Sequence, residues 1–190
     1  MVDPFDTLGI APTFDLDLAA LEKRYRELAR VLHPDRYLGA SAAERRMALG
    51  KAVEVSDAWR LLRDPIRRAE ALLRRHGVRV EEGKEPKAAP EFLMEMLEQR
   101  ESLSEAKASG DAAAVERLAE AIYNRQKDVT ARIAAALASP GSASPNGNDA
   151  PSLDEVVSLL GELRYYRRFL DEVSAIQDGF SERPSGVSND

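Results

Sequence analysis

The chain contains no cysteine, and this absence excludes several kinds of chemistry. Disulfide bonds, thiolate metal sites, cysteine nucleophiles and the ligation of iron–sulfur clusters by thiolates all require that residue. Histidine is almost as scarce, with two in 190 residues. From the residues that remain we predict no catalytic group, no metal site and no cofactor.

Long hydrophobic runs are also missing. Neither of the longer apolar stretches reaches the roughly 18 residues that a membrane-spanning helix needs. The first ten residues, MVDPFDTLGI, lack the basic and apolar regions of a secretory signal. Hydrophobic residues at 44% and charged residues at 32% are typical of a water-soluble protein with charged helices. We therefore expect a cytoplasmic protein that contacts no membrane.

Strand patterns are absent as well. Valine, isoleucine and threonine never alternate with polar residues over the length of a strand, whereas apolar residues recur throughout at steps of three and four. This periodicity predicts an all-α fold, and the length allows two small domains. Residues 1–79 carry 15 basic against 12 acidic side chains, and the remainder carries 12 against 21. This charge asymmetry favours two partners of different surface charge. A chance uneven distribution of surface charges would give the same counts.

Three helices are predicted in the front half. Asp17 is expected to cap a helix that ends at His33-Pro34, because the residue before proline disfavours helical geometry. The sequence from Ser41 to Glu44 has the capping-box pattern at the start of a second, long helix. Pro65 should begin a shorter third helix. The apolar face predicted for the first of these helices consists of Leu18, Leu21, Tyr25, Leu28 and Leu32.

The back half is expected to be a bundle of three helices, at roughly 91–109, 111–138 and 152–179. A charged segment containing glycine and proline precedes it, and a loop rich in serine, proline, glycine and asparagine interrupts it at 139–151. The predicted organisation is a front domain at 1–79, a linker at 80–90, a bundle at 91–180 and a disordered tail at 181–190.

The tripeptide His33-Pro34-Asp35 lies in the turn between the first two long helices. On a helix of about 100° per residue, Lys23, Arg26 and Arg30 cluster roughly opposite the apolar face. Two other interpretations of the tripeptide stay open on these residues alone. His33 and Asp35 could act as a general base and its orienting carboxylate, or the tripeptide could simply end a helix.

This front half resembles a J domain, the module that docks on the ATPase domain of DnaK-type chaperones and stimulates hydrolysis. The residues that carry the resemblance are Asp3, Phe5, Leu8, Gly9 and Ile10 near the start, and Ala58-Trp59, Leu62, Asp64-Pro65 and Arg67 further on. It implies that the basic helix face and the tripeptide bind the chaperone. The implied chaperone-binding residues are Lys23, Arg26, Arg30, His33, Pro34 and Asp35. Arg36 stands where lysine is commoner in that family, which keeps the charge.

The first bundle helix has large apolar side chains off its core face. Phe92, Met96, Leu103 and Ala106 fall on one side, whereas Leu93, Met94 and Leu97 fall on the far side among Glu98, Glu101 and Glu105. In the last helix, Phe169 and Tyr165 likewise point away from the predicted stripe of Leu153, Val156, Leu160, Leu163 and Leu170. Such residues are expected to be exposed and to form a protein-docking patch, unless they belong to a wider core or a dimer contact.

Taken together, the two halves resemble the HscB family, J-domain co-chaperones of iron–sulfur cluster assembly. The resemblance in the back half is carried by segments such as Phe92–Glu95 and Arg168–Asp171. It implies that the chain delivers the scaffold protein IscU to an HscA- or DnaK-type chaperone, without a cofactor of its own. The implied scaffold-binding residues are Leu93, Met94, Leu97, Glu98, Glu101, Glu105 and Phe169.

Other functions remain as alternatives. The chain could be a J-domain adaptor for a different client, or a structural helical oligomer. Nucleic-acid binding is not expected, because the basic face is confined to one helix and the chain has a net charge of -6. A monomer or a weak dimer is expected.

Overall fold

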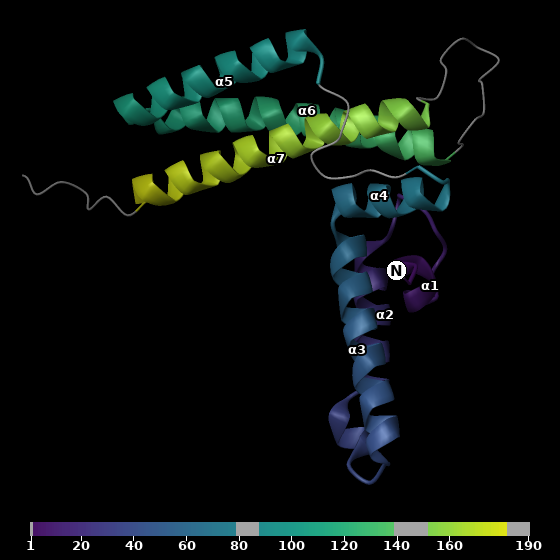
Figure 1. Cartoon of the computed structure of the whole chain (residues 1–190). Coiled ribbons are helices and arrows are strands. Elements are labelled where there is room, and N and C mark those ends of the chain that lie inside the picture. Colours follow the sequence, from purple (N-terminus) through teal and green to yellow (C-terminus); the bar gives the residue numbers. More distant parts are fainter. Residues whose placement is uncertain (1, 79–87, 139–151, 182–190) are drawn as a thin grey trace, which may run out of the picture. The chain divides into compact units, whose positions relative to one another are not determined.

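The computed structural model describes residues 2–78, 88–138 and 152–181 (Figure 1). Every regular element in these ranges is helical, which confirms the all-α prediction. Most of the predicted linker, the loop at 139–151 and the tail from 182 onward lie outside the described residues. The elements are α1 (Pro4–Leu8), α2 (Leu18–Val31), the 3-10 turn η1 (Pro34–Tyr37), α3 (Ala42–Arg63), α4 (Pro65–Arg75), α5 (Pro90–Ser109), α6 (Ala112–Ala138) and α7 (Leu153–Ser181).

The chain divides into two compact units. The first contains α1 to α4, and the second contains α5 with most of α6 and α7. In the first unit α2 and α3 pack side by side as a helical hairpin, with η1 in the connection between them (Figure 1). The stacked rings of Tyr25 on α2 and Trp59 on α3, with centroids 4.7 Å apart, lie at the centre of this contact.

Capping side chains set the ends of the hairpin helices. The Asp17 carboxylate accepts hydrogen bonds from the N–H groups of Ala19 and Ala20, so α2 begins at the predicted residue. Ser41 and Glu44 form the predicted capping box at the start of α3. The hydrogen bonds from Ser41 stabilise the charged carboxylate and lower the pKa of Glu44.

One part of the predicted α2 stripe is wrong. Leu21 is buried, but Leu18 is exposed. Leu18 lies in the first turn, about 60° around the helix from Leu21, and therefore at the edge of the apolar face. A helix terminus covers less core surface than its middle, so an edge residue there stays in contact with solvent.

Two arginines of α4 hold the first unit together. Arg75 pairs with Asp3 at 2.8 Å and with Asp6 at 3.1 Å, which ties α4 to α1. Arg68 is buried, donates a hydrogen bond to the carbonyl of Leu62 and lies over the ring of Phe14. Burial lowers the pKa of Arg68 because the charged form loses hydration. These contacts fix the base of the α2–α3 hairpin.

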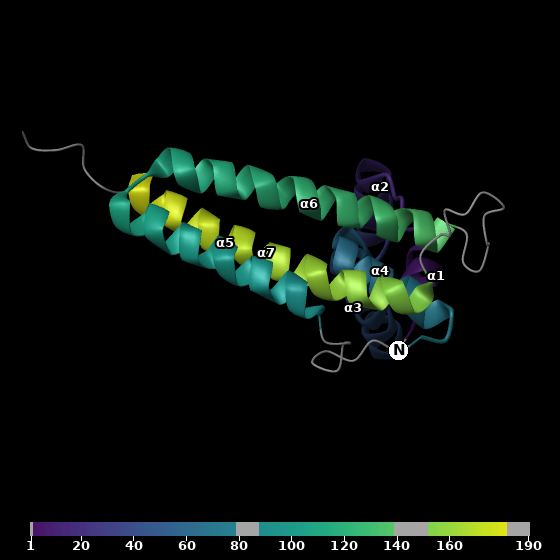
Figure 2. The ribbon, with the colours of Figure 1, turned by 90° about the horizontal axis from the view of Figure 1, so that it is seen from above.

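In the second unit α5, α6 and α7 run side by side (Figure 2). Gly110 adopts a left-handed conformation with φ 71° and ends α5, and the Asp111 carboxylate accepts a hydrogen bond from the N–H of Ala114 at the start of α6. The break between the two helices therefore falls where the predicted ranges 91–109 and 111–138 meet. The core is made of aliphatic side chains that include Met96, Leu103, Val115, Ile122, Val129, Ile133, Val156, Leu160 and Leu163.

Candidate functional site

The basic face of α2 is accessible along its length. Lys23, Arg26 and Arg30 are all exposed, and Leu21 on the opposite side is buried. The Arg26 guanidinium pairs with Glu22 at 2.6 Å within the same helix. Such an exposed intrahelical pair contributes little to stability, so it can be exchanged for a partner's carboxylate at small cost. The predicted exposure of this face is confirmed.

The tripeptide forms the start of η1 and faces solvent. His33 has an extended backbone, Pro34 is the first residue of the 3-10 turn, and Nδ1 of His33 accepts the backbone N–H of Asp35 at 3.3 Å. The lone pair of Nδ1 is therefore directed at the backbone of the turn. The side chains of His33 and Asp35 are 58% and 78% exposed. The turn thus presents the Asp35 carboxylate to solvent, ready to accept hydrogen bonds from outside.

This geometry argues against the alternative of acid–base catalysis. A general base works in a pocket, within hydrogen-bond reach of the group whose proton it takes. In the described part of the chain, the hydrogen bond and the ion pair of His33 lie within its own turn, and its side chain also borders the hollow between α2 and α3. An exposed histidine and carboxylate on a tight turn are better suited to recognition by another protein.

Two hollows border the tripeptide, and sequence reasoning missed both. The larger, about 350 Å³, lies between α2 and α3 and includes Pro34 and Val53 in its wall. The smaller, about 190 Å³, is lined by Leu32 and Leu49 among other residues. Val53 and Leu49 are more than half exposed. Their i, i+4 spacing, on the side of α3 roughly opposite its buried residues, is the signal that could have identified them.

The apolar patch on α5 is present as predicted. Leu93, Met94 and Leu97 are 39%, 63% and 56% exposed, whereas Met96 and Leu103 on the other side of the helix are buried. Acidic residues lie along one side of them. The exposed carboxylates are those of Glu98, Glu101 and Glu105. We call these six residues, Leu93, Met94, Leu97, Glu98, Glu101 and Glu105, the α5 patch.

Phe169 does not belong to this surface, and the prediction that it is exposed is wrong. Its side chain is fully buried at 0% exposure, as is that of Leu163 about 120° away around α7. Because α7 packs against both α5 and α6, its buried arc is wider than a single stripe. Phe169 therefore fills the bundle core. Tyr165 is half-buried, and its ring contacts Phe92 of α5 edge-on at 5.6 Å.

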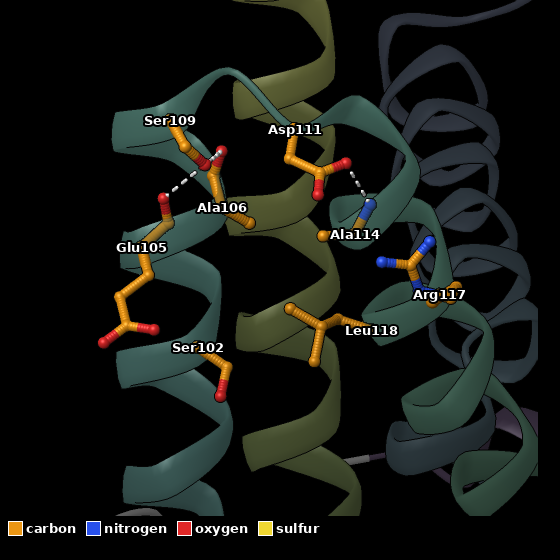
Figure 3. A pocket seen from close by; sticks show the side chains of 8 residues that line it. All are labelled: Ser102, Glu105, Ala106, Ser109, Asp111, Ala114, Arg117 and Leu118. Atoms are coloured by element: carbon orange, nitrogen blue, oxygen red, sulfur yellow. Dashed lines mark hydrogen bonds between the residues drawn. The ribbon is translucent and has the colours of Figure 1, made fainter.

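A shallow hollow of about 470 Å³ lies at the turn between α5 and α6 (Figure 3). Its polar groups form hydrogen bonds within the turn and the adjoining helix ends. Ser109 Oγ donates to the carbonyls of Glu105 and Ala106, and the Asp111 carboxylate accepts the N–H of Ala114. Glu105 and Arg117 lie on opposite sides of the view. The hollow is therefore formed by helix-capping groups, without a convergent set of reactive side chains.

Charged residues cross the bundle seam. Arg125 of α6 pairs with Glu95 of α5 at 2.5 Å, and Arg132 of α6 pairs with Glu155 of α7 at 2.6 Å. Glu162 is half-buried nearby, and its burial raises the pKa of its carboxyl group. Burial together with the charge of Glu162 raises the pKa of Tyr166 to about 12. These ion pairs therefore join α6 to α5 and to α7, and their role is structural.

Among residues 2–78, 88–138 and 152–181, no group of three or more His, Asp or Glu side chains could hold a metal ion. Within the same ranges, no helix combines the length and the apolar character needed to cross a bilayer.

Comparisons with known proteins match both units. Residues 3–71 match the family model described as the DnaJ domain, and residues 88–174 match the model described as the HSCB C-terminal oligomerisation domain. A co-chaperone protein HscB homolog of Ralstonia nicotianae is 36% identical over 92% of this chain and 96% of the relative. A second such homolog, from Shewanella loihica, is 30% identical over 92% and 96%.

Solved structures give the same result. The chaperone HscB from Vibrio cholerae aligns with a TM-score of 0.79 and 28% identity, covering 94% of this chain and 99% of that one. The human co-chaperone protein HscB aligns with a TM-score of 0.78 and 25% identity, covering 93% and 83%. The exposed tripeptide on a J-domain hairpin and the match over nearly the whole length lead to one conclusion: the chain belongs to the HscB family of J-domain co-chaperones.

Proposed function

We propose that the chain stimulates the ATPase of a DnaK/HscA-type chaperone and delivers an IscU-type scaffold protein to it during iron–sulfur cluster maturation. One observation carries this proposal. The chain has two exposed surfaces of different chemistry on separate compact units: a basic helix face next to the tripeptide, and the apolar, acid-rimmed α5 patch. A chain with two such surfaces is suited to holding two partners at once.

The front surface is assigned to the chaperone. Lys23, Arg26 and Arg30 offer three exposed cations on one helix face to an acidic partner surface, and opposite charges of this kind mainly raise the encounter rate and fix orientation. Docking of that row brings Pro34 and the Asp35 carboxylate against the chaperone. The exposed Val53 beside them adds apolar contact area.

The back surface is assigned to the client. Interfaces typically have an apolar centre in which a few side chains carry most of the binding energy, with a polar rim around it. The α5 patch has this composition, with Leu93, Met94 and Leu97 bordered by carboxylates along one side. A scaffold that carries basic side chains around an aliphatic spot is the complementary partner.

Joining the two surfaces on one chain gives the delivery step. When both partners are bound, the client is held close to the chaperone, and its effective concentration there rises without any direct contact between client and chaperone. Because the chain has no cysteine, a cluster on the scaffold gains no thiolate ligand from it. The role in cluster maturation is therefore indirect.

Truncating the apolar centre tests the client assignment. The double variant Met94→Ala, Leu97→Ala should weaken the complex with an IscU-type scaffold by about 30-fold or more, since central apolar contacts are worth about 2 kcal/mol or more. Isothermal titration calorimetry measures the affinity. Because both side chains are exposed, thermal unfolding should change little.

Tyr123→Ala is the matched control. Tyr123 is another large exposed side chain of the bundle, at 60%, but it lies on α6 outside the α5 patch. This control should bind the scaffold like the wild type. An unchanged affinity of the double variant would contradict the client assignment. Light scattering at several protein concentrations tests the alternative that the chain is a structural oligomer. If the double variant lost self-association but bound the scaffold normally, that alternative would be favoured.

A further inference from the structure

The two sides of the apolar centre of the α5 patch, Leu93, Met94 and Leu97, differ in charge. Glu98, Glu101 and Glu105 lie on the side of α5 that turns toward α6 and solvent. The opposite edge of the patch, next to Leu93, is bordered by α7. Contacts between α5 and α7 fix which α7 residues lie along that edge.

Two contacts give the register of the two helices. Phe92 of α5 meets the ring of Tyr165 at 5.6 Å, and Nε of Arg100 lies 4.0 Å from a carboxylate oxygen of Glu172. Tyr165 and Glu172 are seven residues apart on α7, so α5 and α7 run in the same direction with a nearly constant offset. Arg168 lies three residues after Tyr165 and four before Glu172, on the same helix face. It is therefore level with the turn of α5 between Leu93 and Leu97.

Arg168 is available for a partner. Its side chain is exposed, and its guanidinium lies 5.2 Å from the centroid of the Tyr165 ring. Within the residues that the structure describes, no carboxylate pairs with it. Arg100 nearby has Glu172 at the outer limit of an ion pair. The Tyr165 ring, held in turn by Phe92, limits the freedom of the Arg168 side chain and orients it beside the patch.

We propose that Arg168 is a further client-binding residue and that the surface around Leu97 is electrically polarised, with carboxylates on one side and the Arg168 guanidinium on the other. This inference rests on the assignment of the α5 patch to the client. The partner surface that fits has an aliphatic centre, basic side chains facing Glu98, Glu101 and Glu105, and at least one carboxylate facing Arg168. Such a polarised border fixes the orientation in which the client docks.

Charge favours a client over a second copy of the chain. Residues 91–180 carry 9 basic against 16 acidic side chains, so the net charge of the bundle opposes the association of two copies. A scaffold protein with a basic surface segment is attracted to the same bundle. We therefore commit to the client as the occupant and treat self-association as an outcome of the test.

The test measures binding of an IscU-type scaffold to the full chain by calorimetry. Arg168→Glu should weaken the complex about 10-fold or more at low salt, because it places a like charge against the client carboxylate. Arg168→Gln, which keeps most of the side-chain length, should weaken it by about 3-fold. Both losses should shrink at high salt, since screening reduces the interaction. The matched control is Lys127→Glu, a reversal of another exposed charge on the bundle, which should bind like the wild type.

The outcomes separate this inference from the function on which it rests. If the wild type does not bind the scaffold, both are overturned. If the wild type binds and Met94→Ala, Leu97→Ala weakens the complex, but both Arg168 variants bind like Lys127→Glu, the role of Arg168 alone is overturned. If the Arg168 variants bind the scaffold normally but lose self-association in light scattering, Arg168 faces a second copy and the inference is wrong. Circular dichroism of Arg168→Gln shows whether any loss comes from misfolding, which would also overturn it.

Discussion

Replacing Asp35 by asparagine should abolish the stimulation of a DnaK/HscA-type ATPase. The substitution removes the charge of a carboxylate that is 78% exposed at the tip of the α2–α3 connection. Its backbone N–H, which bonds to His33, is retained, so the turn should keep its shape. Charge-assisted hydrogen bonds from the chaperone to this carboxylate would be lost. A steady-state ATPase assay measures the loss, and calorimetry should show unchanged binding of the scaffold.

Asp17→Asn is the control for that variant. It makes the same chemical change in the same unit, but at the opposite end of α2, about 20 Å from the tripeptide. Asparagine caps helices about as well as aspartate, so stability should be kept. This control should stimulate normally. If Asp35→Asn also stimulated normally, the assignment of the front surface to the chaperone would be wrong.

Phe169→Ala should destabilise the bundle by about 3–5 kcal/mol, the usual cost of truncating a fully buried phenylalanine. The loss combines removal of apolar contacts with the cavity that is left in the core. Thermal or urea unfolding of the full chain measures it. Any weaker binding of the scaffold by this variant would then follow from the damaged bundle.

Met94→Ala provides the comparison. Met94 is 63% exposed, so its truncation should change stability by no more than about 0.5 kcal/mol. The two variants therefore separate a core residue from a surface contact. If Phe169→Ala kept wild-type stability and lost only scaffold binding, Phe169 would be a contact after all.

Local chemistry made much of the fold predictable. Asp17, the Ser41–Glu44 capping box, Pro65 and Gly110 each act within a few residues of their own position, and each marks a helix end in the structure. The exposure of Leu93, Met94 and Leu97 was predictable for a similar reason. The core face of α5 is set by its own periodicity, and these three residues fall outside it.

Residues whose environment depends on other helices were harder to predict. Phe169 lies outside the narrow stripe of α7, but two neighbouring helices cover it. Arg68 is a charged residue that the sequence gives no reason to bury, yet it closes the base of the front hairpin. The position of Arg168 beside Leu97 requires the register of α5 against α7. Long-range packing of this kind is not encoded in the spacing of one segment.

The sequence resemblance and the structure give complementary information about the client-binding surface. Both the periodicity of the last helix and the resemblance placed Phe169 among the exposed, scaffold-binding residues, and its burial corrects that placement. The remaining α5 residues keep their assignment, because exposure and composition both suit an interface. On α7, we therefore assign the neighbouring Arg168, and not Phe169, to the client-binding surface, because the side chain of Arg168 is exposed.

The central claim is that this chain couples a client to a chaperone through two separate surfaces. Steady-state ATPase activity of a DnaK/HscA-type chaperone, measured with the chain at sub-saturating concentration and with or without an IscU-type scaffold, tests it most directly. The account predicts that the scaffold increases stimulation by the wild type and adds little with the Met94→Ala, Leu97→Ala variant. Equal ATPase rates with and without the scaffold, at scaffold concentrations that saturate the wild-type chain, would contradict it.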